Sequence, residues 1–147
     1  MSGLHHIELW VPDLAAARRS WGWLLSELGW TVEDPGATSF SATHGDVYLF
    51  VERSPALSGP THDRLAPGVN HLAFHAGPPA RVDALVEAAP AYGWRLLFAS
   101  DESGSATSGA APRPGPVARH PHAGGPDHYA AYLEDGQGYE VELVAER

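Results

Sequence analysis

Apolar and polar side chains alternate over residues 4–11, as they do in a half-buried β-strand. One face carries an imidazole and a carboxylate and consists of Leu4, His6, Glu8 and Trp10. The opposite face is largely apolar and consists of His5, Ile7, Leu9 and Val11. We therefore expect the apolar face to pack on other elements, and the face with His6 to meet solvent or a binding site.

An amphipathic helix is predicted directly after this strand. Asp13 is a suitable N-cap, and Gly29 is a suitable C-terminal stop. Between them, apolar residues recur at helical spacing, at Leu14, Ala17, Trp21, Leu24, Leu25 and Leu28. Such a stripe is typical of a helix face that packs in the core.

Three short strands complete a first unit, and we place them at residues 30–33, 39–43 and 47–52. Turns at residues 34–36 and 44–46 separate them. The first unit then covers residues 1–53 in the order β-α-β-β-β. Residues 54–68 are rich in Pro and Gly and are predicted to be a linker.

The pattern of the first strand returns in the second half of the chain. His71 stands in the setting of His6, and Gly93-Trp94 repeats Gly29-Trp30 after almost the same interval. Two markers at nearly one offset indicate a duplicated unit. A chance likeness between two half-buried strands is the alternative.

The second unit, residues 69–147, is predicted to repeat the first with an insertion. We expect a helix over residues 80–89 that ends or kinks at Pro90, and a turn at residues 134–138. The strands are placed at residues 69–75, 94–99, 128–133 and 139–144. Residues 100–126 lack periodicity, so they form either a functional lid or a disordered segment. We expect a partly ordered lid.

Composition narrows the functions that need to be considered. A chain of 147 residues fits one domain, and its formal charge of −9 disfavours nucleic acid as a partner. Cysteine is absent, which excludes disulfides, thiolate metal sites and cysteine nucleophiles. No apolar run suits a signal peptide or a membrane span, so we expect a cytoplasmic protein without a membrane partner.

The candidate chemistry lies on three strands. Glu142 shares a predicted strand face with Glu140 and Val144. If the polar faces of the strands turn inward, His6, His71 and Glu142 converge. Two imidazoles and one carboxylate with open positions suit a divalent metal ion. The alternative for each of the three is a polar strand residue that is solvated or satisfied by hydrogen bonds.

Two further residues share the face of His6. Trp10 is a candidate substrate-binding residue, as a stacking wall of a pocket. Glu8 is a candidate catalytic residue, as a general base or as a partner that orients a ligand.

Three stretches, residues 6–14, 70–74 and 134–143, carry a resemblance to a known family. With them the chain resembles the vicinal oxygen chelate superfamily of glyoxalases, bleomycin resistance proteins and extradiol dioxygenases. The resemblance implies one α+β domain, in which two βαβββ modules form a cup-shaped mixed sheet with helices on the outside. It also implies metal ligands at His6, His71 and Glu142, and a homodimer.

The end of the chain is similar to that of extradiol dioxygenases, in which a tyrosine binds a substrate oxygen. The resemblance makes Tyr132 a candidate catalytic residue and His128 a candidate substrate-binding residue. For Tyr132, a core aromatic residue is the alternative. Glyoxalase I proteins use a fourth protein ligand in the first module. Aligning Gly45 with Gly138 puts Leu49 at that position, and Leu49 cannot bind metal.

Two functions remain open. The first is a metal-dependent lyase, isomerase or ring-cleaving dioxygenase that acts on a small oxygen-chelating substrate through Fe, Mn, Zn or Ni. The second is a metal-free protein that sequesters a drug or natural product, which five Trp and an acidic surface would suit if the compound is cationic and aromatic. The presence of all three candidate ligands favours the enzyme.

Overall fold

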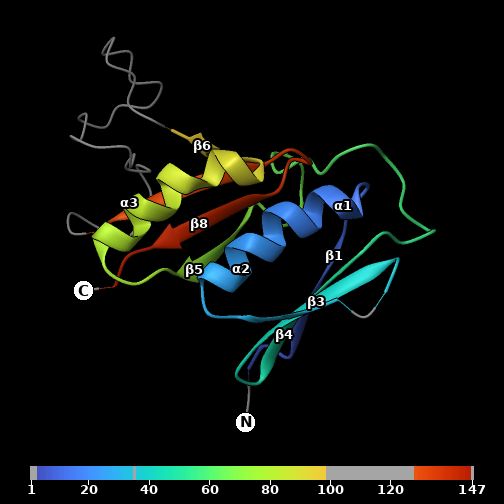
Figure 1. Ribbon diagram of the computed structural model, residues 1–147. Helices are drawn as coiled ribbons and strands as arrows, with labels where there is room; N and C mark the ends of the chain where they lie inside the picture. The colour runs from blue at the N-terminus through green and yellow to red at the C-terminus, as the bar shows by residue number, and fades with distance from the viewer. Residues whose placement is uncertain (1–2, 35, 99–127, 147) are drawn as a thin grey trace. The chain divides into compact units, whose positions relative to one another are not determined.

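The computed structural model describes residues 3–34, 36–98 and 128–146 (Figure 1). The described chain forms two compact units, Met1–His62 and Asp63–Arg147. The boundary between them falls inside the predicted linker. The predicted lid at residues 100–126 lies outside the described residues.

The first unit is built on a mixed four-stranded sheet in the order β1-β4-β3-β2. Its strands are β1 (His6–Trp10), β2 (Thr31–Glu33), β3 (Ser39–His44) and β4 (Val47–Glu52). β1 runs parallel to β4, and the other neighbours are antiparallel. The four strands predicted for this unit are confirmed to within two residues at each end.

The predicted helix of the first unit is confirmed, with a change of winding in its middle. α1 (Leu14–Ala17) continues into the π-helical turn η1 (Arg18–Gly22) and then into α2 (Trp23–Glu27). The Asp13 carboxylate accepts the N–H of Ala16 at 3.0 Å, and Gly29 has the positive φ of a C-terminal stop. The Ser20 hydroxyl donates to the Ala16 carbonyl, a bond that competes with the regular helix ladder.

The core of the first unit joins this helix to one face of the sheet. Leu9 and Val11 are buried, as the alternation in the first strand predicts. The side chains that are almost completely buried come from helix and strands alike, and the largest are Trp21, Phe40, Leu24, Leu25, Leu49 and Val51. The other face of the sheet is left for polar and half-exposed side chains, among them His6 and Glu8.

The second unit repeats this topology, with strands in the order β5-β8-β7-β6. They are β5 (His71–His75), β6 (Trp94–Leu97), β7 (Ala130–Asp135) and β8 (Glu140–Val144). α3 (Pro79–Ala88) lies along one face of this sheet (Figure 1), and the 3₁₀ turn η2 (Ala89–Tyr92) follows it at Pro90. The identical strand order confirms the predicted duplication and the α+β class.

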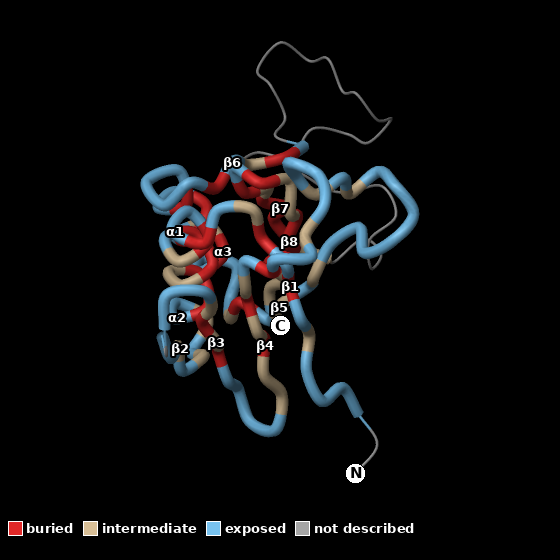
Figure 2. The backbone as a smooth tube through the Cα atoms, turned by 90° about the vertical axis from the view of Figure 1, so that its right-hand side faces the viewer, coloured by how far each residue is buried: buried red, intermediate tan, exposed pale blue. Residues whose placement is uncertain are grey.

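β7 and β8 are buried along most of their length, whereas the β3–β4 hairpin is exposed at its tip (Figure 2). β7 begins two residues later than predicted and continues through Asp135. The turn before β8 therefore lies at residues 136–139, whereas it was predicted at residues 134–138. Among the described residues, no helix is long and apolar enough to cross a membrane.

Strand register corrects one alignment made from the sequence. His6 pairs with Tyr48, and His71 pairs with Glu140. Two positions further along, Phe50 therefore corresponds to Glu142, and Leu49 lies on the opposite, buried face. Alignment on glycines fails by one residue because the pair Thr43–Tyr48 encloses four residues, whereas the corresponding pair Glu134–Glu140 encloses five. Phe50, like Leu49, has no metal-binding atom.

Asp135 organises the turn between β7 and β8. Its Oδ1 accepts the backbone N–H groups of Gln137 at 2.9 Å and of Tyr139 at 3.0 Å, and Asp135 is only 5% exposed. Burial raises the pKa of Tyr139, and the charge of Asp135 raises it further. Asp135 thus fixes the turn that sets the register of β8.

We expect Asp135→Ala to lower the free energy of unfolding by about 2–3 kcal/mol, because the backbone N–H groups of Gln137 and Tyr139 lose their acceptor. Urea denaturation followed by circular dichroism measures this loss. Asp46→Ala, in the exposed turn between β3 and β4, is the matched control and should change stability by less than about 0.5 kcal/mol. Equal effects of the two substitutions would contradict this role of Asp135.

Candidate functional site

A polar cluster lies on the face of the second sheet that carries His71. Strand register explains how residues far apart in the sequence reach it. His71 lies opposite Glu140, and Glu142 lies opposite Ala73 on one side and Tyr132 on the other. Since directly paired residues point to the same side of a sheet, these side chains share one face.

Glu142 is the centre of this cluster. Its Oε2 lies 3.2 Å from Nε2 of His71, and its Oε1 lies 2.9 Å from Nε2 of His128. The Tyr132 hydroxyl donates to the same Oε1 at 2.8 Å. Glu142 is only 7% exposed, so the contacts of Oε1 with His128 and Tyr132 replace part of the water that its carboxylate gives up. Oε1 is held by two partners, and Oε2 faces His71.

The environment keeps Tyr132 in its neutral, donating form. Burial raises the pKa of the Tyr132 phenol, and the hydrogen bond to Glu142 and the charges of Glu142 and Glu140 raise it further. The ring contacts His71 and Phe98 edge to face, at centroid distances of 5.9 and 5.7 Å. Tyr132 therefore serves both as a hydrogen-bond donor and as a wall of the cluster.

A second group of carboxylates on this sheet face is paired with arginines. Arg64 lies 2.9 Å from Glu140 and 3.3 Å from Glu134, and Arg95 also pairs with Glu134. The side chain of Glu140 is 2% exposed, so its charge depends on Arg64 for compensation. The pairing ties the segment before β5 to β7 and β8.

His71 is held from its other side by Asn70. Nδ1 of His71 lies 2.8 Å from Oδ1 of Asn70, and Nδ2 of Asn70 donates to the Arg64 carbonyl at 2.9 Å. Neither Asn70 nor Arg64 was predicted from the sequence to belong to a site. A polar residue directly before a candidate ligand was the only available signal for Asn70. Arg64 gave none, because its partners lie far along the chain.

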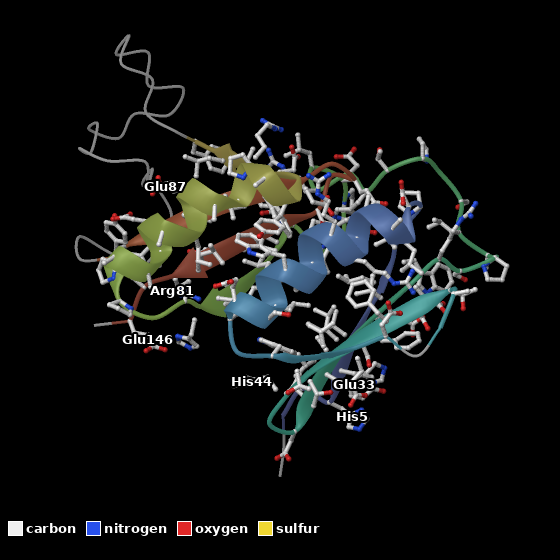
Figure 3. All side chains as sticks on the ribbon, in the orientation of Figure 1. His5, Glu33, His44, Arg81, Glu87 and Glu146 are labelled. Atoms are coloured by element: carbon white, nitrogen blue, oxygen red, sulfur yellow. The ribbon has the colours of Figure 1, made fainter. Side chains whose placement is uncertain are left out.

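Three of the other predicted residues lie on the first unit. His6 stacks on Tyr48 with ring centroids 4.8 Å apart and an interplanar angle of 7°, and its Nδ1 lies 2.9 Å from Nδ1 of His5. The indole N–H of Trp10 donates to Glu8 at 2.5 Å, and Trp10 is 39% exposed. Figure 3 shows His5 projecting from the start of this unit.

The predicted residues thus fall into two sets. His71, His128, Tyr132 and Glu142 meet within the second unit, whereas His6, Glu8 and Trp10 belong to the first. Within residues 3–34, 36–98 and 128–146, no group of three or more His, Asp or Glu side chains has the arrangement of a metal site. The ligand set His6, His71 and Glu142 therefore stays a prediction.

The chemistry of the His71–Glu142 pair nevertheless suits a divalent cation. An imidazole nitrogen and a carboxylate oxygen are both common ligands of Zn, Fe and Mn. When His71 carries its proton on Nδ1, the lone pair of Nε2 faces Oε2 of Glu142 at 3.2 Å. A cation near both atoms turns this repulsion into attraction. His71 and Glu142 can therefore supply two ligands of one ion.

Comparison with known proteins supports this reading of the fold. Residues 5–111 match the family model of the glyoxalase/bleomycin resistance protein/dioxygenase superfamily. The uncharacterised protein YqjT of Bacillus subtilis (strain 168) is 39% identical over 144 residues, which cover 97% of this chain and 98% of YqjT.

Solved structures show the same architecture. A protein from Bacillus halodurans, provisionally assigned as a glyoxalase, is 35% identical with a TM-score of 0.77, over 99% of this chain and 97% of that one. A glyoxalase/bleomycin resistance protein from Albidiferax ferrireducens T118 is 20% identical with a TM-score of 0.66, over 99% of this chain and all of that one, and shows the fold alone. With its duplicated sheets and this family match, the chain belongs to the glyoxalase/bleomycin resistance protein/dioxygenase superfamily.

Proposed function

We propose that the protein is a divalent-metal-dependent enzyme that acts on a small substrate with neighbouring oxygen atoms, as a lyase, an isomerase or a ring-cleaving dioxygenase. The observation that carries this proposal is the buried Glu142 carboxylate, whose Oε2 faces Nε2 of His71. In this proposal His71 and Glu142 are two ligands, and His6 is the third, as the sequence predicts. The ion is Fe, Mn, Zn or Ni.

The partners of Glu142 fit this role. A carboxylate ligand needs its remaining oxygen held, because outer hydrogen bonds fix its orientation and tune its affinity. His128 and Tyr132 both contact Oε1, which leaves Oε2 directed to His71. The raised pKa of Tyr132 keeps its proton available for such a bond.

The residues of the second unit are also proposed to act on a substrate. A divalent ion held by these residues would supply Lewis acidity toward the substrate. The Tyr132 hydroxyl and Nε2 of His128 both contact Oε1 of Glu142. Both are proposed to contact substrate oxygens. Glu8 is proposed as a general base and Trp10 as a stacking residue.

Metal content tests the proposal directly. Purified protein is expected to bind about one divalent ion per chain, and the His6→Ala, His71→Ala and Glu142→Gln variants are expected to lose it, because each removes one ligand. Equilibrium dialysis followed by elemental analysis measures the stoichiometry.

His75→Ala is the matched control for the histidine variants. His75 lies on the same strand as His71 and faces Glu146 at 3.8 Å, but its side chain is 85% exposed. Glu146 projects from the chain just after β8 (Figure 3). Metal that stays bound after both His71→Ala and Glu142→Gln would contradict the proposed ligands.

A tyrosine variant tests the support of Glu142. Tyr132→Phe is expected to weaken metal binding by about tenfold to a hundredfold, because Oε1 of Glu142 loses its hydroxyl donor while the ring contacts remain. Titration with Mn²⁺ or Zn²⁺ in a calorimeter measures the affinity. Tyr129→Phe removes another tyrosine–carboxylate bond of the second unit, to Asp83 away from Glu142, and should leave metal affinity unchanged. If both variants bind metal as the unaltered chain does, Tyr132 does not support a ligand.

A second candidate function is metal-free binding of a drug or natural product. The half-exposed indole of Trp10 beside the exposed Glu8 carboxylate favours it, because this pair suits a cationic aromatic compound. The formal charge of −9 would also attract such compounds.

Tryptophan fluorescence of metal-free protein, measured against a panel of cationic aromatic dyes, tests this second function. A dye that quenches should bind Trp10→Ala more weakly by about 0.5–2 kcal/mol, the range of a cation–π contact. Trp23→Phe, in α2, is the control for general loss of signal. Absence of quenching by every dye, or equal binding to Trp10→Ala, would rule this site out as a binding surface.

A further inference from the structure

We propose that Asn70 is a positioning residue that holds the ring proton of His71 on Nδ1, so that His71 presents the lone pair of Nε2 toward Glu142. The consequence for metal affinity rests on the proposed function. The placement of the proton does not, and it can be measured without metal.

The orientation of the Asn70 amide follows from its two neighbours. One is the backbone carbonyl of Arg64, an atom that can only accept a hydrogen bond, so the NH₂ group of Asn70 must face it, at 2.9 Å. The amide oxygen then faces Nδ1 of His71 at 2.8 Å. An amide oxygen can only accept, so the hydrogen of this contact belongs to Nδ1.

The Arg64 carbonyl is a fixed reference for this amide. The Arg64 side chain lies between the carboxylates of Glu140 and Glu134, at 2.9 and 3.3 Å, and is only 20% exposed. Asn70 itself lies at an exposed position before β5, where an amide without such a partner could rotate. The ion pairs of Arg64 are thus connected to His71 through the Arg64 carbonyl and the Asn70 amide.

Glu142 competes with Asn70 for the ring proton, and the geometry favours Asn70. The contact from Nε2 of His71 to Oε2 of Glu142 is longer, at 3.2 Å, than the contact from Nδ1 to Asn70, at 2.8 Å. The contacts of Glu142 with His128 and Tyr132 are both made by its other oxygen, Oε1. A neutral histidine that ligates through Nε2 needs its proton on Nδ1, so Asn70 prepares the ring for a cation.

Nitrogen-15 NMR of the imidazole rings in the metal-free full chain tests the placement of the proton, at a pH where the rings are neutral. His71 is assigned by the signal that His71→Gln removes. The unaltered chain should show His71 protonated on Nδ1. In Asn70→Ala the proton should move to Nε2, toward Glu142. In Asn70→Asp it should stay on Nδ1, because a carboxylate still accepts there.

Metal affinity gives a second readout on the same variants. Asn70→Ala should bind Zn²⁺ about tenfold to a hundredfold more weakly, and Asn70→Asp should recover most of this loss. Ser58→Ala, at an exposed linker position, is the control and should bind as the unaltered chain does.

The outcomes separate the two proposals. A His71 ring that stays protonated on Nδ1 in Asn70→Ala would overturn the inference. So would equal spectra of Asn70→Asp and Asn70→Ala, which would assign the effect to the contact with Arg64 instead. If none of Fe²⁺, Mn²⁺, Zn²⁺ and Ni²⁺ binds the unaltered chain while the proton moves as expected in Asn70→Ala, the role of Asn70 stands and the metal-dependent function fails.

Discussion

The burial of the Glu142 carboxylate is the constraint on which the candidate site depends. A carboxylate withdrawn from water must be hydrogen-bonded or compensated, or it loses its charge. Glu142 meets this demand with His128 and Tyr132 on Oε1, while its Oε2 faces Nε2 of His71. These side chains lie far from Glu142 in the sequence, and they reach it because β5, β7 and β8 pair in the right register. The sheet therefore has to form before this chemistry can exist.

Duplication supplied the scaffold twice but the polar cluster once. The two sheets have the same strand order, and His6 and His71 occupy corresponding positions. In the first unit, however, Phe50 corresponds to Glu142 and Ser41 to Tyr132. The first unit can thus offer an imidazole, an indole and the exposed Glu8 on its open face, but no buried carboxylate at the position of Glu142. The two units thus share one strand topology but carry different polar side chains.

Much of the fold was predictable because each unit uses strong local signals. Alternation gave the strands, and Asp13 and Gly29 marked the ends of the first helix, which their hydrogen bond and positive φ confirm. The error at Leu49 arose because the turn organised by Asp135 is one residue longer than its counterpart, and sequence spacing cannot reveal such a difference. The contact between His71 and Glu142 was predictable, because the alternation of polar and apolar residues places both side chains on the polar faces of their strands.

The parts of the site that could not be predicted depend on the path of the linker. Asn70 and Arg64 act through a backbone carbonyl, and no residue pattern announces where a Pro- and Gly-rich segment places its carbonyls. Burial of Glu140 beside Arg64 was equally invisible, because the two lie far apart in the chain. The π-helical turn at η1 was not predicted for a related reason. The Ser20 hydroxyl competes with the backbone hydrogen bonds of the helix, and this leaves the apolar pattern of the sequence unchanged. Side-chain bonds to backbone atoms are thus the least predictable contacts of this protein.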